Sequence, residues 1–276
     1  MGQGADTTQS QIVAEVLGIP LADISIVDGD TEACGHTMPQ VGSPATHMVG
    51  QATKAAAEEA RRQVLKYASE RLSVKAEELD IKDRRIFVKK EPEKGLTLKE
   101  LMSTPLFKYQ SSPEIIASVD QGVSFEKTGK MMMAHFAEVE VDTETGKVKV
   151  TDYLAAHDSG VIVNHAICEN QINGGMNQGI GMALTEDLKY DENTGMVLNP
   201  NLVDYKILKA LDLPDPKAMF IEVVDEEGPF GAKGRGEGVT CPVPGAIASA
   251  VYSAIGVRVD PPINPETVLR ALGKIS

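Results

Sequence analysis

The stretch Gly228-Pro-Phe-Gly-Ala-Lys-Gly-Arg-Gly-Glu-Gly-Val239 constrains the fold most, because it sets one carboxylate among glycines directly before an apolar segment. Glycine has no β-carbon, so the alternating glycines leave main-chain N–H groups open to a large ligand. Residues 243–255 are rich in Ala and Ile at helical spacing, which predicts a helix that begins shortly after Glu237. A surface turn whose carboxylate interacts with the helix dipole is the simpler alternative.

Three further segments combine glycine with the start of a helix. Met1-Gly-Gln-Gly-Ala-Asp-Thr-Thr-Gln9 opens one helical run, and Val41-Gly-Ser-Pro44 precedes a long one. Asn164–Gly175 carries amide side chains and continues into Gln178-Gly-Ile-Gly181. The first N–H groups of a helix lack intrahelical partners, so such turns can bind an anion. Taken alone, each segment is more simply a helix cap or a packing contact.

In their order and spacing, the four segments resemble the C-terminal half of the molybdenum-binding subunit of the molybdenum hydroxylases, the xanthine dehydrogenase and aldehyde oxidase family. The similarity covers nearly the whole chain. It implies that two turns and one later glutamine contact a pyranopterin cofactor, namely Gly2, Gln3, Gly4, Gly42, Ser43 and Gln171. The family's Lys-Gly-x-Gly-Glu motif matches Lys233-Gly-Arg-Gly-Glu237 residue by residue. This match implies that Glu237 is the catalytic base.

The same resemblance implies a bound molybdopterin, in its cytosine dinucleotide form, that carries molybdenum. The implied reaction adds water-derived oxygen to an electron-poor carbon of a small substrate, either an N-heterocycle of the purine or nicotinate type or an aldehyde. Electrons would leave for an iron–sulfur subunit and an FAD subunit, so those two cofactors are expected on partner chains. No residue of this chain is expected to ligate the metal.

The chain departs from the family pattern in two places. Family members place the Gly-Gln-Gly turn deep inside a long polypeptide, whereas here it begins at Gly2. The N-terminal molybdopterin-binding half is therefore expected either on a separate subunit, as in some bacterial nicotinate dehydrogenases, or on a missing part of a longer chain. Many members also have proline after the glutamate, where this chain has Gly238. The substitution loosens the geometry expected for the loop.

Composition restricts the classes of partner. The net charge of −13 disfavours nucleic acid, because proteins that bind the phosphate backbone present a basic face. It does not disfavour an anionic pterin nucleotide, since backbone amides hold phosphate without a basic chain. The sequence contains no run of about 18 apolar residues, so no membrane span is predicted. Without a signal-like start, the cytoplasm is the expected location.

Cysteine and histidine usage gives no independent site. Cys34, Cys168 and Cys241 are far apart and form no Cys-x-x-Cys pair, so they cannot hold an iron–sulfur cluster alone. Cys241 lies four residues from Glu237 and is either a neighbour of the cofactor or, more simply, a buried structural thiol. The five histidines lack zinc-type spacing, and we expect structural or solvent-facing roles for them.

The patterning predicts an α+β fold made of two similar α/β lobes of the molybdopterin-binding domain, at residues 1–120 and 121–276, with the glycine turns converging at the seam. Residues 109–129 read as the connection. The expected helices are 8–17, 45–72, 98–102, 168–183 and 243–255. The expected strands are 24–27, 78–81, 85–89, 132–141, 147–155, 184–190 and 219–224, with a turn at 142–146.

Two alternatives belong to other functional classes. The first is a catalytically silent structural or interaction subunit whose partner holds the metal, against which Glu237 argues. The second is a phosphate-binding, kinase-like enzyme, which rests on the glycine-rich loops alone. The chain lacks both the Gly-x4-Gly-Lys-Ser/Thr spacing and the kinase catalytic-loop signature.

Overall fold

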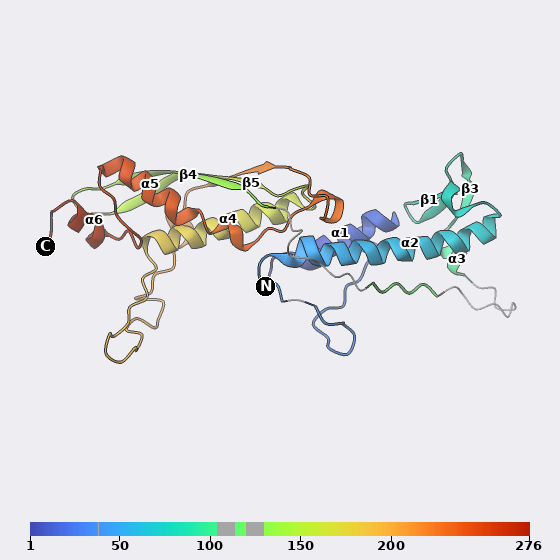
Figure 1. Ribbon diagram of the computed structural model, residues 1–276, viewed down its shortest axis with the longest axis horizontal. Coiled ribbons are helices and arrows are strands. Elements are labelled where there is room, and N and C mark those ends of the chain that lie inside the picture. Colours follow the sequence, from blue (N-terminus) through green and yellow to red (C-terminus); the bar gives the residue numbers. More distant parts are fainter. Residues whose placement is uncertain (38, 104–113, 120–129) are drawn as a thin grey trace. The chain divides into compact units, whose positions relative to one another are not determined.

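The chain forms two compact units that each combine helices with a small sheet, which confirms the α+β expectation (Figure 1). The computed structural model describes residues 1–37, 39–103, 114–119 and 130–276. Unit 1 comprises Met1–Gly129 and Asp225–Lys233, and unit 2 comprises Lys130–Val224 and Gly234–Ser276. The boundary expected after residue 120 lies outside the described residues.

Two helices pack against each other in unit 1. Helix α1 (Ala5–Leu17) ends at Gly18, whose left-handed φ of 65° suits a residue without a β-carbon. Helix α2 (Gly50–Leu72) follows a π-helical turn at Ala45–Val49. The 45–72 helix is thus confirmed in extent. Its first turn, however, is wound more widely than the periodicity predicted.

The other half of unit 1 is a hairpin sheet covered by α2. Strands β1 (Leu79–Lys82), β2 (Arg85–Val88) and β3 (Glu91–Thr97) pair antiparallel in sequence order and lead into α3 (Leu98–Met102). Thr97 caps α3 in a capping box with Glu100, which satisfies N–H groups at the helix start. The core beneath is formed by buried aliphatic side chains: Val64, Ala68, Leu79, Ile81, Ile86, Val88 and Leu101.

Unit 2 is a three-stranded sheet with its helices on one face. Strand β4 (Met133–Val141) pairs antiparallel with β5 (Val148–Asp158), and β5 pairs parallel with β6 (Pro216–Ile221). Helix α4 (His165–Leu184) lies in the connection from β5 to β6, as a parallel pair requires.

Helices α5 (Val243–Ile255) and α6 (Pro265–Ala271) complete unit 2. Helix α5 packs along β4 and against α4, and α4 contacts β6. Alternate residues of the strands face these helices, and strand and helix side chains together form an apolar core that includes Tyr153, Ile172, Met176, Ile180, Val243, Ile247 and Val251. Burying a side chain of this size contributes about 1.5–3 kcal/mol. The apolar layer therefore fixes α4 and α5 to the sheet.

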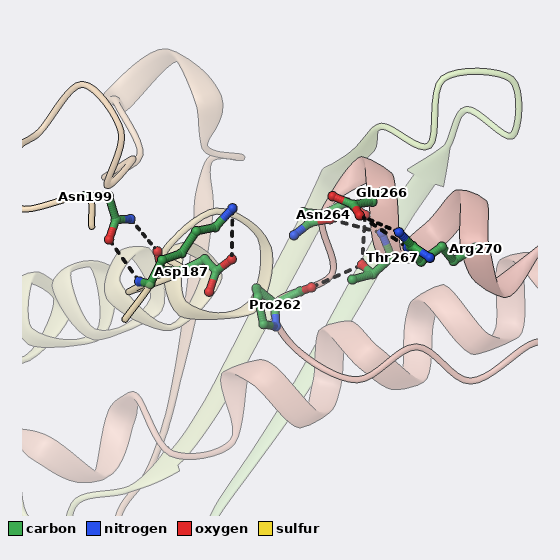
Figure 2. A network of polar contacts seen from close by, with 8 residues as sticks. Asp187, Asn199, Pro262, Asn264, Glu266, Thr267 and Arg270 are labelled. Carbon is green, nitrogen blue, oxygen red and sulfur yellow. Dashed lines mark hydrogen bonds and ion pairs between the residues drawn. The ribbon is translucent and has the colours of Figure 1, made fainter. Parts of the chain in front are cut away.

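Polar contacts fix two connections of unit 2 (Figure 2). The Asn199 side chain donates to the Asp187 carbonyl at 2.7 Å and accepts the Lys189 N–H at 2.9 Å. At the start of α6, Asn264 accepts the Thr267 N–H at 3.0 Å. These contacts hold the long 185–209 connection and the entry to α6 without a regular strand.

The predicted helices and the two predicted hairpins are all present, with ends shifted by a few residues. The strand expected at 24–27 is wrong, because the segment pairs with no described strand and Val27 is 67% exposed. The strand expected at 184–190 is also wrong, since only an isolated bridge, Tyr190–Val197, forms there. The strand at 219–224 is displaced to β6. Strand β3 and helix α6 were not predicted.

One described segment, Glu237–Ile255, is long and apolar enough to cross a membrane by length and composition alone. A core helix of a globular unit meets the same test. Val243, Ile247 and Val251 recur every four residues and are fully buried against the sheet, as expected of such a core helix.

Candidate functional site

The Gly-Gln-Gly turn and the Gly-Ser turn lie close together in unit 1. The Gln3 side chain donates from Nε2 to Oε1 of Gln40 at 2.8 Å, two residues before Gly42. Gly2 and Gly4 have left-handed φ values of 90° and 77°. Gly4 precedes α1 without a side-chain cap, so the first N–H groups of the helix rely on other acceptors.

The Gly42–Ser43 turn has an unusual backbone. Gly42 and Ser43 are both left-handed, with φ values of 77° and 60°, and the second of these is costly for a residue with a β-carbon. The π-helical turn Ala45–Val49 follows immediately, and such turns concentrate at functional sites. A β-carbon built on Gly2 or on Gly42 meets no atom within 4 Å. The backbone here thus stands open, and among the described residues no atom packs where either β-carbon would stand.

Segment 225–233 packs onto the same part of unit 1. Asp225 accepts from Nε2 of His47 at 3.2 Å, and both residues are buried. Pro229 lies against Gly50, where an added β-carbon would come within 2.9 Å of its ring. No local sequence pattern indicates the His47–Asp225 pair, because its members are 178 positions apart. The structural or solvent-facing role expected for His47 stays a prediction.

Glu237 occupies the start of a short helical turn in unit 2. The turn, Glu237–Val239, lies four residues before α5, and the Glu237 side chain is exposed. A β-carbon on Gly238 would come within 2.7 Å of Met131 Cε and 3.1 Å of Met133 Cε. The two methionines therefore pack against the loop. A proline at this position, as many family members carry after the glutamate, would require the two methionine side chains to shift.

Helix α4 supports the same loop. Gly175 approaches Val239 so closely that an added β-carbon would lie 2.7 Å from its side chain. Thr240 donates to Gln178 at 3.5 Å. Gln171 is half-buried and, by helical periodicity, shares this face of α4 with Gly175 and Gln178. Unit 2 thus brings Gln171 and the Glu237 loop to one side, as unit 1 does for Gln3, Gly42 and Ser43.

The two cations of the glutamate motif are largely buried. Lys233 is 8% exposed. The guanidinium nitrogens of Arg235 are buried, and its central carbon lies 5.1 Å from the centroid of the Phe220 ring. Burial lowers the pKa of Arg235, and the charge of Asp158 opposes that shift.

A buried polar chain crosses the sheet next to this loop. Nδ1 of His135 lies 2.9 Å from the Tyr153 hydroxyl, and its Nε2 lies 2.6 Å from Nε2 of His157. Burial lowers the pKa of each histidine to about 4, and the Arg235 charge contributes for His157. Burial also raises the pKa of Tyr153. At neutral pH both imidazoles are therefore uncharged.

Cysteines add little to either region. Cys241 is exposed, so its expectation as a buried thiol is wrong, and its Sγ lies 3.9 Å from the Glu237 carbonyl. Burial raises the pKa of Cys168, which keeps this thiol protonated. Within the described part of the chain, no three His, Cys, Asp or Glu side chains gather as a metal-ligand set.

The model of the molybdopterin cofactor-binding domain matches residues 1–214. The chain belongs to this family. It is 32% identical over 269 residues to the putative xanthine dehydrogenase molybdenum-binding subunit of Escherichia coli, covering 96% of this chain and 36% of that relative. It is also 32% identical over 248 residues to the carbon monoxide dehydrogenase large chain of Afipia carboxidovorans, covering 87% and 30%.

Solved structures give the same assignment. The Cu,Mo-CO dehydrogenase matches with a TM-score of 0.85 and 28% identity, over 100% of this chain and 35% of that chain. Quinoline 2-oxidoreductase from Pseudomonas putida matches with a TM-score of 0.82 and 30% identity, over 100% and 36%. The chain thus spans about a third of the length of the relatives it matches.

The described residues fit a molybdopterin of this family. Gly2 and Gly42 leave space where a β-carbon would stand, beside the amide of Gln3 and the hydroxyl of Ser43. The exposed Glu237 carboxylate is flanked by Gly236 and Gly238. Open backbone donors suit the polar edges of a pterin and a phosphate, and a carboxylate without steric cover suits proton transfer.

Proposed function

We propose that this chain is the C-terminal part of the molybdopterin-binding subunit of a molybdenum hydroxylase. The proposed reaction adds water-derived oxygen to an electron-poor carbon of an N-heterocycle, of the purine or nicotinate type, or of an aldehyde. The observation that carries the proposal is the exposed Glu237 carboxylate, held between two glycines in the Lys233–Glu237 motif of a chain that belongs to this family.

Glu237 is the base of the proposed reaction. When bound, the molybdenum cofactor supplies the two-electron acceptor and the oxygen for the hydroxylation. A carboxylate oxygen of Glu237 accepts the proton released as the nucleophilic oxygen forms. Gly238 and Gly175 keep the loop against Met131 and α4, which restricts the positions that the carboxylate can take.

The glycine turns bind the cofactor in this proposal. Backbone N–H groups at Gly2, Gly4 and Gly42, together with the side chains of Gln3 and Ser43, would contact the pterin and its phosphate. Gln171 would contribute from α4. We propose the cytosine dinucleotide form, because N–H groups at helix starts can hold a second phosphate in a chain with a net charge of −13.

We assign the N-terminal half and the electron-transfer cofactors of the enzyme to polypeptide segments outside this chain. The chain spans about a third of its relatives, which supports an N-terminal molybdopterin-binding half on a separate subunit or on a missing part of a longer chain. We further propose an iron–sulfur subunit and an FAD subunit as electron acceptors, in the cytoplasm. Relatives named for xanthine and quinoline support an N-heterocyclic substrate.

The decisive experiment is coexpression of the chain with its N-terminal half, followed by molybdenum and pterin analysis. We expect stoichiometric cofactor in the assembly and almost none in the chain purified alone. Anaerobic addition of xanthine, nicotinate or an aromatic aldehyde should then reduce the loaded assembly. An assembly that lacks pterin would contradict the proposal. A loaded assembly whose reduction does not depend on Glu237 would point to a silent subunit.

A further inference from the structure

Unit 2 holds a concentration of buried polar atoms without hydrogen-bond partners. Within its described residues they belong to three side chains only: Nδ1 of His157, Oγ of Ser159, and Nε, Nη1 and Nη2 of Arg235. We call these three residues the Arg235 cluster. Buried polar groups in proteins are normally paired, so several unpaired atoms in one region need an explanation.

The three residues lie at one end of the β5–β6 pair. His157 on β5 is in register with Phe220 on β6, and the Arg235 guanidinium stands over that ring at 5.1 Å. Ser159 follows β5 directly, and its N–H donates to the Ile221 carbonyl at 3.2 Å. His157 and Ser159 are 0% and 3% exposed. The unpaired atoms thus come from adjoining positions of one buried region.

Neighbouring groups do not supply the missing acceptors. Burial raises the pKa of the Cys168 thiol, which is therefore neutral near pH 7. Asp158 acts on Arg235 through its charge, but its Oδ1 accepts the Gly160 N–H at 3.0 Å. None of the three Arg235 nitrogens has a hydrogen-bond partner among the described residues. A buried guanidinium without acceptors is costly, so a ligand with acceptor oxygens would stabilise it.

We propose that the Arg235 cluster binds a small oxyanion, a carboxylate or a phosphate group. The planar guanidinium presents parallel N–H groups that match two oxygens of such an anion. The Ser159 hydroxyl donates a further hydrogen bond. Glu237, two residues from Arg235, is exposed whereas the guanidinium nitrogens are buried, so this site is distinct from the proposed catalytic carboxylate.

The histidine chain completes the site with one more donor. We assign the proton order in which Tyr153 donates its hydroxyl proton to Nδ1 of His135 and Nε2–H of His135 donates to Nε2 of His157, one of the orders that the distances of 2.9 and 2.6 Å allow. This order leaves the proton of His157 on Nδ1, the unpaired nitrogen. A bound oxyanion favours this tautomer over the reverse order, because only Nδ1–H donates to it. Tyr153 is therefore a positioning residue for the anion.

Thermal unfolding of the full chain tests the proposal without molybdenum, so its outcome is independent of the proposed function. The probes are inorganic phosphate and acetate, titrated at constant ionic strength with chloride as the balancing anion. At ten times the dissociation constant we expect Tm to rise by about 3–6 °C. A response to phosphate alone indicates a phosphorylated ligand, and a response to acetate indicates a carboxylate. Equal Tm in phosphate, acetate and chloride would overturn the site.

Variants locate the effect. Arg235→Leu should abolish the anion-dependent rise, and Arg235→Lys, which keeps the charge but loses the parallel donors, should weaken anion affinity about tenfold. Tyr153→Phe should weaken anion affinity several-fold, although the Tyr153 side chain does not itself contact the anion. Arg258→Leu is the matched control, because Arg258 is a highly exposed arginine of the same unit. An unchanged rise in both Arg235 variants would overturn the assignment, and Arg235→Lys decides if Arg235→Leu does not fold.

Discussion

The Gly42–Ser43 turn of unit 1 and the Glu237 loop of unit 2 are both rich in glycine, yet glycine does different things in them. In the turn, Gly42 is left-handed and a β-carbon there would stand in open space. In the loop and on α4, a β-carbon on Gly238, Gly175 or Gly179 would come within 2.4–2.7 Å of a neighbouring side chain, which would have to shift. One region keeps its backbone accessible, and the other is closed by packing around a single exposed carboxylate.

From this contrast we expect the largest effect from a substitution of Glu237. Glu237→Gln keeps the size of the side chain but cannot accept a proton, and an exposed position tolerates the change. Folding and cofactor content should therefore be retained in the assembled enzyme. The rate of reduction by substrate should fall by about 10²–10⁴-fold, the usual contribution of a positioned base. Stopped-flow reduction of the loaded assembly measures this rate.

Glu192→Gln is the matched control, because Glu192 is an exposed glutamate of the same unit. Its rate should equal that of the unaltered enzyme. A near-normal rate in Glu237→Gln would reduce Glu237 to a carboxylate at the start of a helical turn, and unit 2 would then carry no chemistry of its own.

The second effect concerns the closed interior of unit 2. Burial lowers the pKa of His135 and His157 to about 4, against 6.5 in the unfolded chain. The unfolded state therefore binds more protons between these pH values, and the stabilisation present above pH 6.5 is lost as the pH falls toward 4. The free energy of unfolding should fall by on the order of 2–3 kcal/mol for each histidine. Urea unfolding at several pH values measures it.

His135→Gln, which keeps polar contacts but does not titrate, should flatten this pH dependence. His36→Asn should leave it unchanged, since His36 is exposed. If both variants follow the parent curve, the loss of stability at low pH comes from carboxylates instead, and the histidine chain is not closed from solvent.

A pair of glycines on α4 separates packing from access within one helix. Gly179→Ala places a β-carbon 2.4 Å from Val243 Cβ and should destabilise unit 2 by about 1–3 kcal/mol through overpacking. In Gly174→Ala the new β-carbon meets no atom within 4 Å, so this change should stabilise the helix by about 0.8–1 kcal/mol. Urea midpoints of the two variants should thus move in opposite directions. Equal shifts would mean that α4 is not held against α5 as described.

Local sequence patterns predicted most helices and both hairpins, because amphipathic spacing and turn residues act over short distances. They failed at residues 24–27 and 184–190, where apolar residues find no partner strand. They also did not predict which glycines face open space and which pack against other side chains. Whether Gly42 faces space or Gly238 faces Met131 depends on contacts between segments far apart in sequence. The position of the buried Arg235 guanidinium over the Phe220 ring of β6 depends on such contacts in the same way.

The cofactor roles of Gly2, Gln3, Gly4, Gly42, Ser43 and Gln171 came from family resemblance, and they stay predictions. The fold adds a physical reason to test them. It places Gln3 close to the Gly42–Ser43 turn through Gln40, and it leaves that turn strained and open. The stretches of regular structure that surround the turn could be read from spacing alone. The left-handed Ser43 could not, because serine usually adopts a negative φ.

The smallest effect, at Ser43, tests the open turn most directly. Ser43 holds a left-handed φ of 60°, which glycine adopts without the cost of a β-carbon. Ser43→Gly should therefore stabilise unit 1 by about 1 kcal/mol, as relief of a strained residue does. The same change removes the hydroxyl proposed to contact the pterin, so cofactor retention in the assembly should fall about two- to tenfold.

Urea unfolding of the chain and pterin content after dialysis give the two readings, with Ser69→Gly on α2 as a control that should not lower pterin content. A rise in the free energy of unfolding together with a fall in pterin content would show that the strained Ser43 backbone contributes to cofactor binding. A variant that gains stability and keeps all of its pterin would show that the Gly42–Ser43 turn is a chain reversal only, and that its open backbone serves no ligand.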